Sequence, residues 1–143
     1  MAFTIESTYN GRGLIADDMI VGASTLVAGS LVALTKGAGK PTATIVTTAV
    51  PDALVVQGGV TGATGKIVRI FRGDVLLADV TAADGTTAMS SGETTSHIAL
   101  VGSQAQRVSA TGLTLNGVTE AGGKMELLSY DSVKQKARVT IKA

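Results

Sequence analysis

The sequence predicts an all-β protein, a compact β-sandwich or β-barrel of short antiparallel strands with an extended N-terminal arm. Short runs rich in β-branched residues recur between Gly, Asn, Asp and Pro, which is the pattern of many short strands. No segment has the length and 3.6-residue periodicity of a convincing helix. Glycine, at 18 of 143 residues, exceeds its usual share of about 7% and supplies residues for turns.

The clearest strand lies at the C-terminal end, where Ala137, Val139 and Ile141 alternate with charged or polar residues and are expected to face inward. The segment Lys66–Arg72 also alternates, but neither of its faces is purely apolar. The expected strands are Phe3–Thr8, Leu31–Thr35, Ala43–Thr48, Ala53–Gln57, Lys66–Arg72, Val75–Val80, His97–Val101, Gln106–Ala110, Met125–Tyr130 and Ala137–Lys142.

Turn residues divide these strands. Asn116-Gly117 predicts a two-residue hairpin turn, because both residues tolerate positive φ. Phe71–Val75 predicts a tight reversal, and 36–41 and 82–96 predict loops. The segment Asp131–Gln135 has room for one helical turn.

Neither an evident sequence repeat nor a shift in composition divides the chain. Residues 1–12 are expected to form an N-terminal arm or edge strand, and residues 13–143 a single β domain. A chain of this length has enough surface to bury one core.

Composition argues against several classes of partner. The 12 basic residues nearly balance the 11 acidic ones and are scattered, whereas a nucleic-acid groove needs a concentrated positive field. The uncharged stretch Met19–Thr35 is shorter than the ~20 residues of a membrane span and fits a buried strand, turn and strand. We therefore expect no nucleic acid and no membrane partner. Residues 1–9 lack the pattern of a secretory signal, which predicts synthesis in the cytoplasm.

The sequence offers little for catalysis or metal binding. There is no cysteine, and the single histidine, His97, has no recognisable nucleophile or oxyanion element beside it. The pairs Gly39-Lys40 and Gly65-Lys66 lack the first glycine of a phosphate loop and precede strands rather than a helix. The pair Asp17-Asp18 is not part of a calcium loop. We expect no enzyme activity and no catalytic, cofactor or metal site.

Aromatic residues make up only 3% of the chain, so its core must be built from Val, Ala, Leu and Ile. Such a core supplies less hydrophobic stabilisation to set against chain entropy. Association with other subunits then becomes favourable, which predicts a structural protein held in an assembly.

Four segments together resemble the decoration (cement) proteins of tailed-phage capsids: Phe3-Thr4-Ile5, the Gly- and Ala-rich Val27–Leu34, the Gly58-Gly59 turn, and Arg72–Leu77. The resemblance implies a virion protein on the outer capsid surface. It would be a homotrimer that binds the major capsid protein and clamps neighbouring subunits.

The resemblance also implies that Ala2–Tyr9 is an arm that adds a strand to a shell subunit. Its anchors would be Phe3, Ile5 and Tyr9, and Phe71 is a further expected interface residue. The alternative for these residues is an ordinary edge strand of the protein's own core.

Two other functions remain open. A tail-tube, fibre or adhesin subunit would have a similar composition but would form rings, filaments or stalks. A small enzyme or ligand-binding barrel would need a cavity with convergent polar groups, for which the sparse histidine and aromatic content is unfavourable.

Overall fold

A computed structural model confirms the all-β fold. It describes residues 3–11, 13–22, 24–46, 50–81, 106–108, 115–119, 125–131, 134 and 136–141. The strands are β1 (Thr4–Ser7), β2 (Ala16–Val21), β3 (Leu31–Thr35), β4 (Thr42–Ile45), β5 (Ala53–Gln57), β6 (Thr64–Arg69), β7 (Val75–Thr81), β8 (Gln106–Val108), β9 (Leu115–Thr119), β10 (Met125–Asp131) and β11 (Lys136–Ile141), with a 3-10 turn η1 at Tyr9–Gly11.

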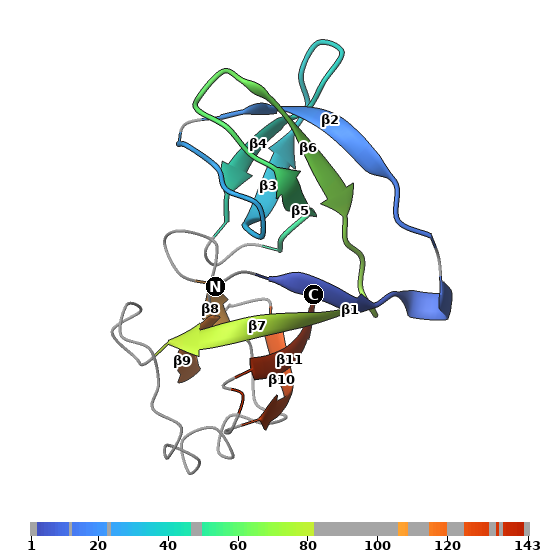
Figure 1. The fold of residues 1–143 in the computed structure, drawn as a ribbon, viewed down its shortest axis with the longest axis vertical. Helices are drawn as coiled ribbons and strands as arrows, with labels where there is room; N and C mark the ends of the chain where they lie inside the picture. The colour runs from blue at the N-terminus through green and yellow to red at the C-terminus, as the bar shows by residue number, and fades with distance from the viewer. Residues whose placement is uncertain are drawn as a thin grey trace.

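The strands β2 to β6 form a closed barrel, in the order β2-β4-β3-β5-β6 (Figure 1). All neighbours are antiparallel except β2 and β4, which are parallel. Small and branched side chains fill the interior, as the scarcity of aromatic residues predicts. They are Met19, Val21, Leu26, Val32, Ala43, Ala53, Val55 and Ile67.

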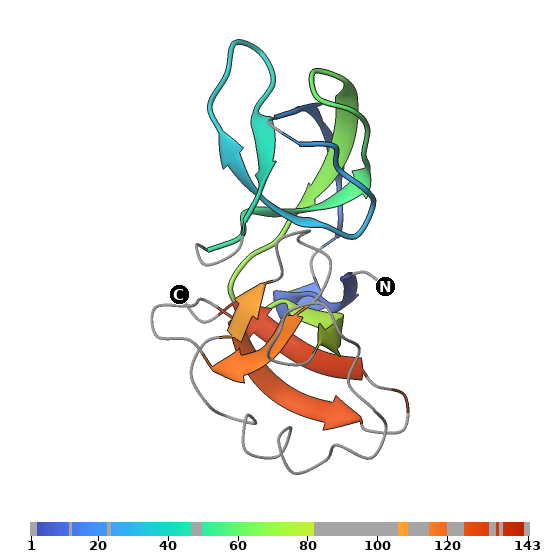
Figure 2. The ribbon, with the colours of Figure 1, turned by 90° about the vertical axis from the view of Figure 1, so that its left-hand side faces the viewer.

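The remaining strands form a second sheet, in the order β1-β7-β11-β10-β8-β9. Strand β9 also pairs with β7, so β7, β11, β10, β8 and β9 follow one another around a ring. Figure 2 shows this sheet below the barrel, with the chain passing from one to the other between β6 and β7.

The two rings of strands have the same connectivity. Strand β2 pairs in parallel with β4 and antiparallel with β6, and β7 pairs in the same way with β9 and β11. Strand β3 lies between β4 and β5, as β8 lies between β9 and β10. Finally, β5 pairs with β6, as β10 pairs with β11. We call β2–β6 (residues 16–69) the first repeat and β7–β11 (residues 75–141) the second repeat. The similarity is one of strand pairing, and the sequence did not predict it.

The repeats also agree residue by residue in their last hairpin. Ala53 pairs with Arg69 in the first repeat, and Met125 with Ile141 in the second, each 72 residues later (53 to 125, 69 to 141). Both hairpins contain a register shift at the same place, between Val55 and Gln57 and between Leu127 and Ser129. A bulge is a specific feature of a strand pair, so its recurrence in register strengthens the equivalence.

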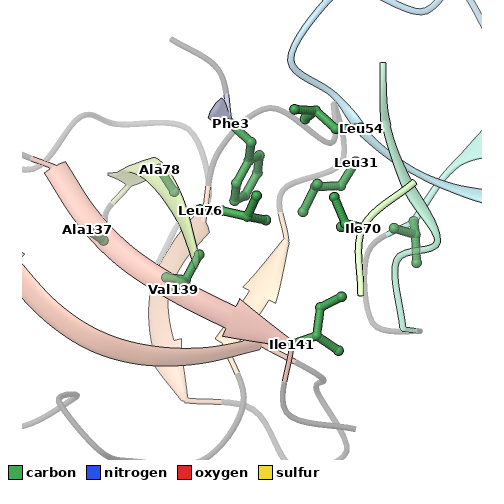
Figure 3. Close-up of a cluster of buried hydrophobic side chains, with 10 residues drawn as sticks. Phe3, Leu31, Leu54, Ile70, Leu76, Ala78, Ala137, Val139 and Ile141 are labelled. Carbon is green, nitrogen blue, oxygen red and sulfur yellow. The ribbon is translucent and has the colours of Figure 1, made fainter. Parts of the chain in front are cut away.

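A shared hydrophobic core joins the two repeats (Figure 3). Leu31, Leu54 and Ile70 approach from the barrel side, and Leu76 and Val139 from the second sheet. The phenyl ring of Phe3 lies among them, and its backbone N–H donates to the Gly29 carbonyl oxygen (3.1 Å). The described members of this cluster are Phe3, Leu31, Val46, Leu54, Ile70, Leu76, Ala78, Ala137, Val139 and Ile141.

Most of the expected strands are present, and the inward positions of Ala137, Val139 and Ile141 are confirmed, since all three are buried. The mixed faces of Lys66–Arg72 also have an explanation: Ile67 faces the barrel interior, while Ile70 belongs to the shared core. The loop at 36–41 is confirmed between β3 and β4.

Some predictions are wrong or untested. Asn116 and Gly117 lie inside β9, where pairing overrides their turn preference. The list of expected strands gave no bounds for β2, although a strand, turn and strand were expected within Met19–Thr35, and β2 begins three residues earlier, at Ala16. The predicted strand His97–Val101 and the loop at 82–96 lie outside the described residues. The helical turn at Asp131–Gln135 is described only in part: Asp131 ends β10 and Lys134 lies in a turn. The division into residues 1–12 and 13–143 stays a prediction.

Candidate functional site

Exposed apolar side chains gather where the chain enters and leaves the barrel. Leu14 and Ile15 lie just before β2, and Phe71 just after β6, and they line one open groove of about 220 Å³. Ile15 is 77% exposed and Phe71 52%. The groove is completed by Gly13, Asp17, Val68 and Arg69.

Tyr9 extends this surface. It is 62% exposed, and its ring lies against the backbone of Gly73, where an added Cβ would be 2.9 Å from Tyr9 Cδ2. Two of the chain's four aromatic residues (two Phe, two Tyr) are thus exposed in one region. We call Tyr9, Leu14, Ile15 and Phe71, with the groove, the apolar surface. Exposed apolar patches of this kind mark interaction sites.

A buried carboxylate holds the apolar surface in place. Asp74 is almost fully buried, and its two oxygens accept hydrogen bonds from the N–H groups of Tyr9 (3.0 Å) and Phe71 (2.8 Å). The Asp74 N–H donates back to the Phe71 carbonyl oxygen (3.0 Å), which closes the turn expected at Phe71–Val75. Gly73 has φ of 98°, the positive value that a type II turn requires at its third position.

Asp74 therefore ties the N-terminal segment and the exit of the first repeat to the start of β7. Its own carbonyl oxygen accepts from the Thr140 hydroxyl (2.9 Å), which adds β11 to the same network. This junction therefore fixes the backbone at Tyr9 and Phe71 through hydrogen bonds to one buried side chain.

An ion pair lies beside each repeat, with its basic residue at an equivalent position, Lys66 in β6 and Arg138 in β11. Lys66 Nζ lies 2.7 Å from Asp18 Oδ1 on β2, and Arg138 Nη2 lies 2.6 Å from Glu6 Oε1 on β1. The hydrogen bond from Lys66, followed by its charge, holds the pKa of Asp18 below its usual value, and the charge of Lys40 adds to this. Both pairs are exposed to solvent, so their net contribution to stability is small.

The predicted interface residues fall in different environments. Tyr9 and Phe71 are exposed and lie on the apolar surface, whereas Ile5 is half-buried in β1. Phe3 is only 1% exposed, and its ring packs in the shared core. In this structure Phe3 therefore belongs to the protein's own core, which was the alternative expected for it, and its role as a partner anchor stays a prediction. Likewise, β1 pairs with the chain's own β7.

Sequence reasoning missed Leu14 and Ile15, which line the groove. The available signal was an adjacent apolar pair between Gly13 and Asp17, in a segment expected to be neither strand nor core. Their exposure could not be inferred from residue type, because solvent-exposed leucine and isoleucine are common in folded proteins.

The structure describes the two Gly-Lys pairs and the Asp17-Asp18 pair, but not His97. Gly65-Lys66 lies within β6 and Gly39-Lys40 precedes β4, so neither opens a helix. Asp17 and Asp18 are exposed, and among the described residues no three His, Cys, Asp or Glu side chains are grouped to hold a metal ion. His97 lies outside the described residues. No helix in the described ranges is long and apolar enough to cross a membrane.

Comparisons with known proteins add no further constraint. No protein-family model matches the chain, and neither the curated proteins nor the solved structures contain a match. The arguments below therefore rest on the geometry of the chain itself.

Proposed function

We propose that this chain is a structural virion protein that binds the outer surface of a phage capsid and stabilises the shell by clamping neighbouring major capsid subunits. It acts as a homotrimer, without enzymatic activity or a cofactor. It is synthesised in the host cytoplasm and resides on the capsid surface. The observation that carries the proposal is the apolar surface formed by Tyr9, Leu14, Ile15 and Phe71.

Two properties of this surface support a protein partner. Tyrosine and other aromatic residues are enriched at the energetic centres of protein interfaces, and Tyr9 and Phe71 are exposed in a chain that has very few aromatic residues. The backbone of both residues is also held by hydrogen bonds to the buried Asp74 carboxylate. A backbone held in this way loses less conformational freedom on binding.

Binding only to the assembled shell would stabilise it by mass action. A trimer that contacts several shell subunits would also gain effective concentration for its second and third contacts after the first. The likeness in segment order to capsid decoration proteins supports the capsid as the partner.

The test is binding to purified empty shells, measured by co-sedimentation. We expect Ile15→Ser and Phe71→Ser each to weaken binding by about tenfold or more, as at central interface residues. Val60→Ser is the matched control, since Val60 is 66% exposed in the loop between β5 and β6, outside the groove. Equal binding by all three variants would contradict the proposal.

Oligomeric state separates the alternatives. Light scattering of the purified chain should show a trimer, and shells with bound chain should melt at a higher temperature than bare shells. A chain that polymerises into tubes or filaments and ignores shells would instead support a tail-tube, fibre or adhesin subunit.

A further inference from the structure

The equivalence of the two repeats identifies an unfilled strand position. In the second repeat, β11 pairs with one edge of β7 from Leu76 to Asp79, while the other edge is shared. Strand β9 covers the C-terminal part of that second edge, at Val80 and Thr81. Strand β1 covers the N-terminal part, with Thr4 opposite Leu77 and Ser7 opposite Val75.

Within the described ranges, the first repeat has no counterpart of β1. Strand β2 pairs with β6 along one edge, from Ala16 to Ile20. On the other edge β4 pairs only with Ile20 and Val21. Among the described residues, no strand pairs with that second edge at Ala16–Asp18. We call this the open edge.

The backbone groups of the open edge point outward. The N–H of Ile20 donates to the Pro41 carbonyl oxygen (2.9 Å), and that of Gly22 donates to Ala43 (2.8 Å), both on the side of β4. Alternate residues of a strand direct their N–H and C=O groups to the same edge. Ala16 and Asp18 therefore direct theirs to the open edge. An unpaired row of such groups is a template for another strand.

The register identifies what the open edge lacks. Met19 and Asp17 in β2 pair with Gly65 and Ile67, as Ala78 and Leu76 in β7 pair with Ala137 and Val139. Asp18 thus corresponds to Leu77 and Ala16 to Val75, the two residues opposite Thr4 and Ser7 of β1. At the equivalent edge of the second repeat, the chain places an antiparallel, extended segment of four residues, Thr4–Ser7.

The open edge begins where the apolar surface ends along the chain. Leu14 and Ile15 directly precede Ala16, while the groove that they line is completed on the β6 side by Val68, Arg69 and Phe71. In the second repeat the covering strand places Ile5 against the shared core.

We infer that the open edge of β2 binds an extended segment of the shell subunit, which adds to the first repeat as the strand that β1 provides to the second. This inference rests on the proposed function and names the mode of contact. Main-chain hydrogen bonds to Ala16 and Asp18 supply the pairing.

The test is Ala16→Pro in the full-length chain, compared with Ala16→Thr. Proline removes the N–H that faces the open edge, and no hydrogen bond within the described chain uses that N–H. Threonine keeps the N–H and favours a strand. We expect Ala16→Pro to weaken binding to purified empty shells by about tenfold, since a main-chain hydrogen bond is lost and the ring hinders the partner strand. Ala16→Thr should bind like the unmodified chain.

Hydrogen exchange on the unmodified chain provides a measurement that does not depend on the fold of a variant. The amides of Ala16 and Asp18 should exchange rapidly in the free chain, and those of Val75 and Leu77 slowly. Binding to shells should slow exchange at Ala16 and Asp18 and leave Val75 and Leu77 unchanged.

Each other outcome overturns the inference. If the chain binds shells but Ala16→Pro binds equally well, or Ala16 and Asp18 stay unprotected, the open edge is not the contact, and the proposed function survives. If the free chain loses its oligomeric state on Ala16→Pro, a second copy covers the edge. If the unmodified chain does not bind shells, the proposed function and the inference both fail.

Discussion

The two repeats share one pairing scheme but fill it differently. In the first repeat the cross-strand pair that faces the interior is Met19 with Gly65, a large and a very small residue. Its counterpart in the second repeat is Ala78 with Ala137, two small residues. The second repeat also has β1 along its edge and the ring of Phe3 against Leu76. The comparison shows that two repeats can keep the same strand order and register although different parts of the chain fill their cores. It also shows that a strand edge paired in one repeat can be left unpaired in the other.

The largest expected effect comes from removing the ring that joins the repeats. Phe3→Ala should lower the free energy of unfolding by about 3–5 kcal/mol, because it leaves a cavity in the shared core. Urea denaturation measures the loss. Tyr9→Ala removes an exposed ring and should lower the free energy of unfolding much less. An equal loss for both variants would contradict the role of Phe3 in joining the two repeats.

Asp74→Ala tests the junction between the repeats. It leaves the N–H groups of Tyr9 and Phe71 without their acceptor, so we expect a loss of about 2–3 kcal/mol in urea denaturation. Asp52→Ala is the matched control, because Asp52 also accepts a backbone hydrogen bond, from Leu34 (2.8 Å), but at an exposed site. A loss no greater than that of Asp52→Ala would show that burial of Asp74 is unimportant.

Gly65→Ala tests the difference in core filling directly. An added Cβ would lie 2.4 Å from the Gln57 carbonyl oxygen and 2.7 Å from Met19 Cε, so we expect a loss of about 1–3 kcal/mol from overpacking. The same methyl group is already present at the counterpart, Ala137. Gly13→Ala is the control, since nothing lies within 4 Å of its added Cβ. If Gly65→Ala is as stable as the control, the first repeat has room that the structure does not show.

The smallest expected effect concerns the ion pair of the first repeat. The pKa of Asp18 is lower in the folded chain than in the unfolded one, chiefly through the hydrogen bond from Lys66. Its contribution to stability is therefore present above the unfolded pKa of about 3.9 and is lost as the pH falls through the folded pKa.

Asp18→Asn should accordingly reduce stability slightly at neutral pH and flatten the dependence of the melting temperature on pH below about 4. High salt should weaken the same effect, because the pair is exposed. If the melting temperature of Asp18→Asn depends on acidic pH in the same way as that of the unmodified chain, the Lys66 contact does not persist in solution.

Local patterns in the sequence anticipated the parts of the fold that depend on neighbouring residues. Alternation placed Ala137, Val139 and Ile141 inward because side chains of a strand alternate between faces whatever it pairs with. The hairpin expected at Asn116-Gly117 failed because tertiary pairing kept both residues within β9. Of the residues expected at an interface, Tyr9 and Phe71 are exposed and Phe3 is buried, while the exposed Leu14 and Ile15 were not among them.

Composition and periodicity by themselves determined that the chain is all-β, short of aromatic residues and built of many short strands. Only the tertiary structure decided that these strands repeat one pairing scheme, that Phe3 is a core residue, and that β2 keeps an open edge. The physical reason is that strand partners are chosen by burial and hydrogen bonding between segments far apart in the chain. Such pairing leaves little trace in local sequence, because many different apolar residues satisfy the same register.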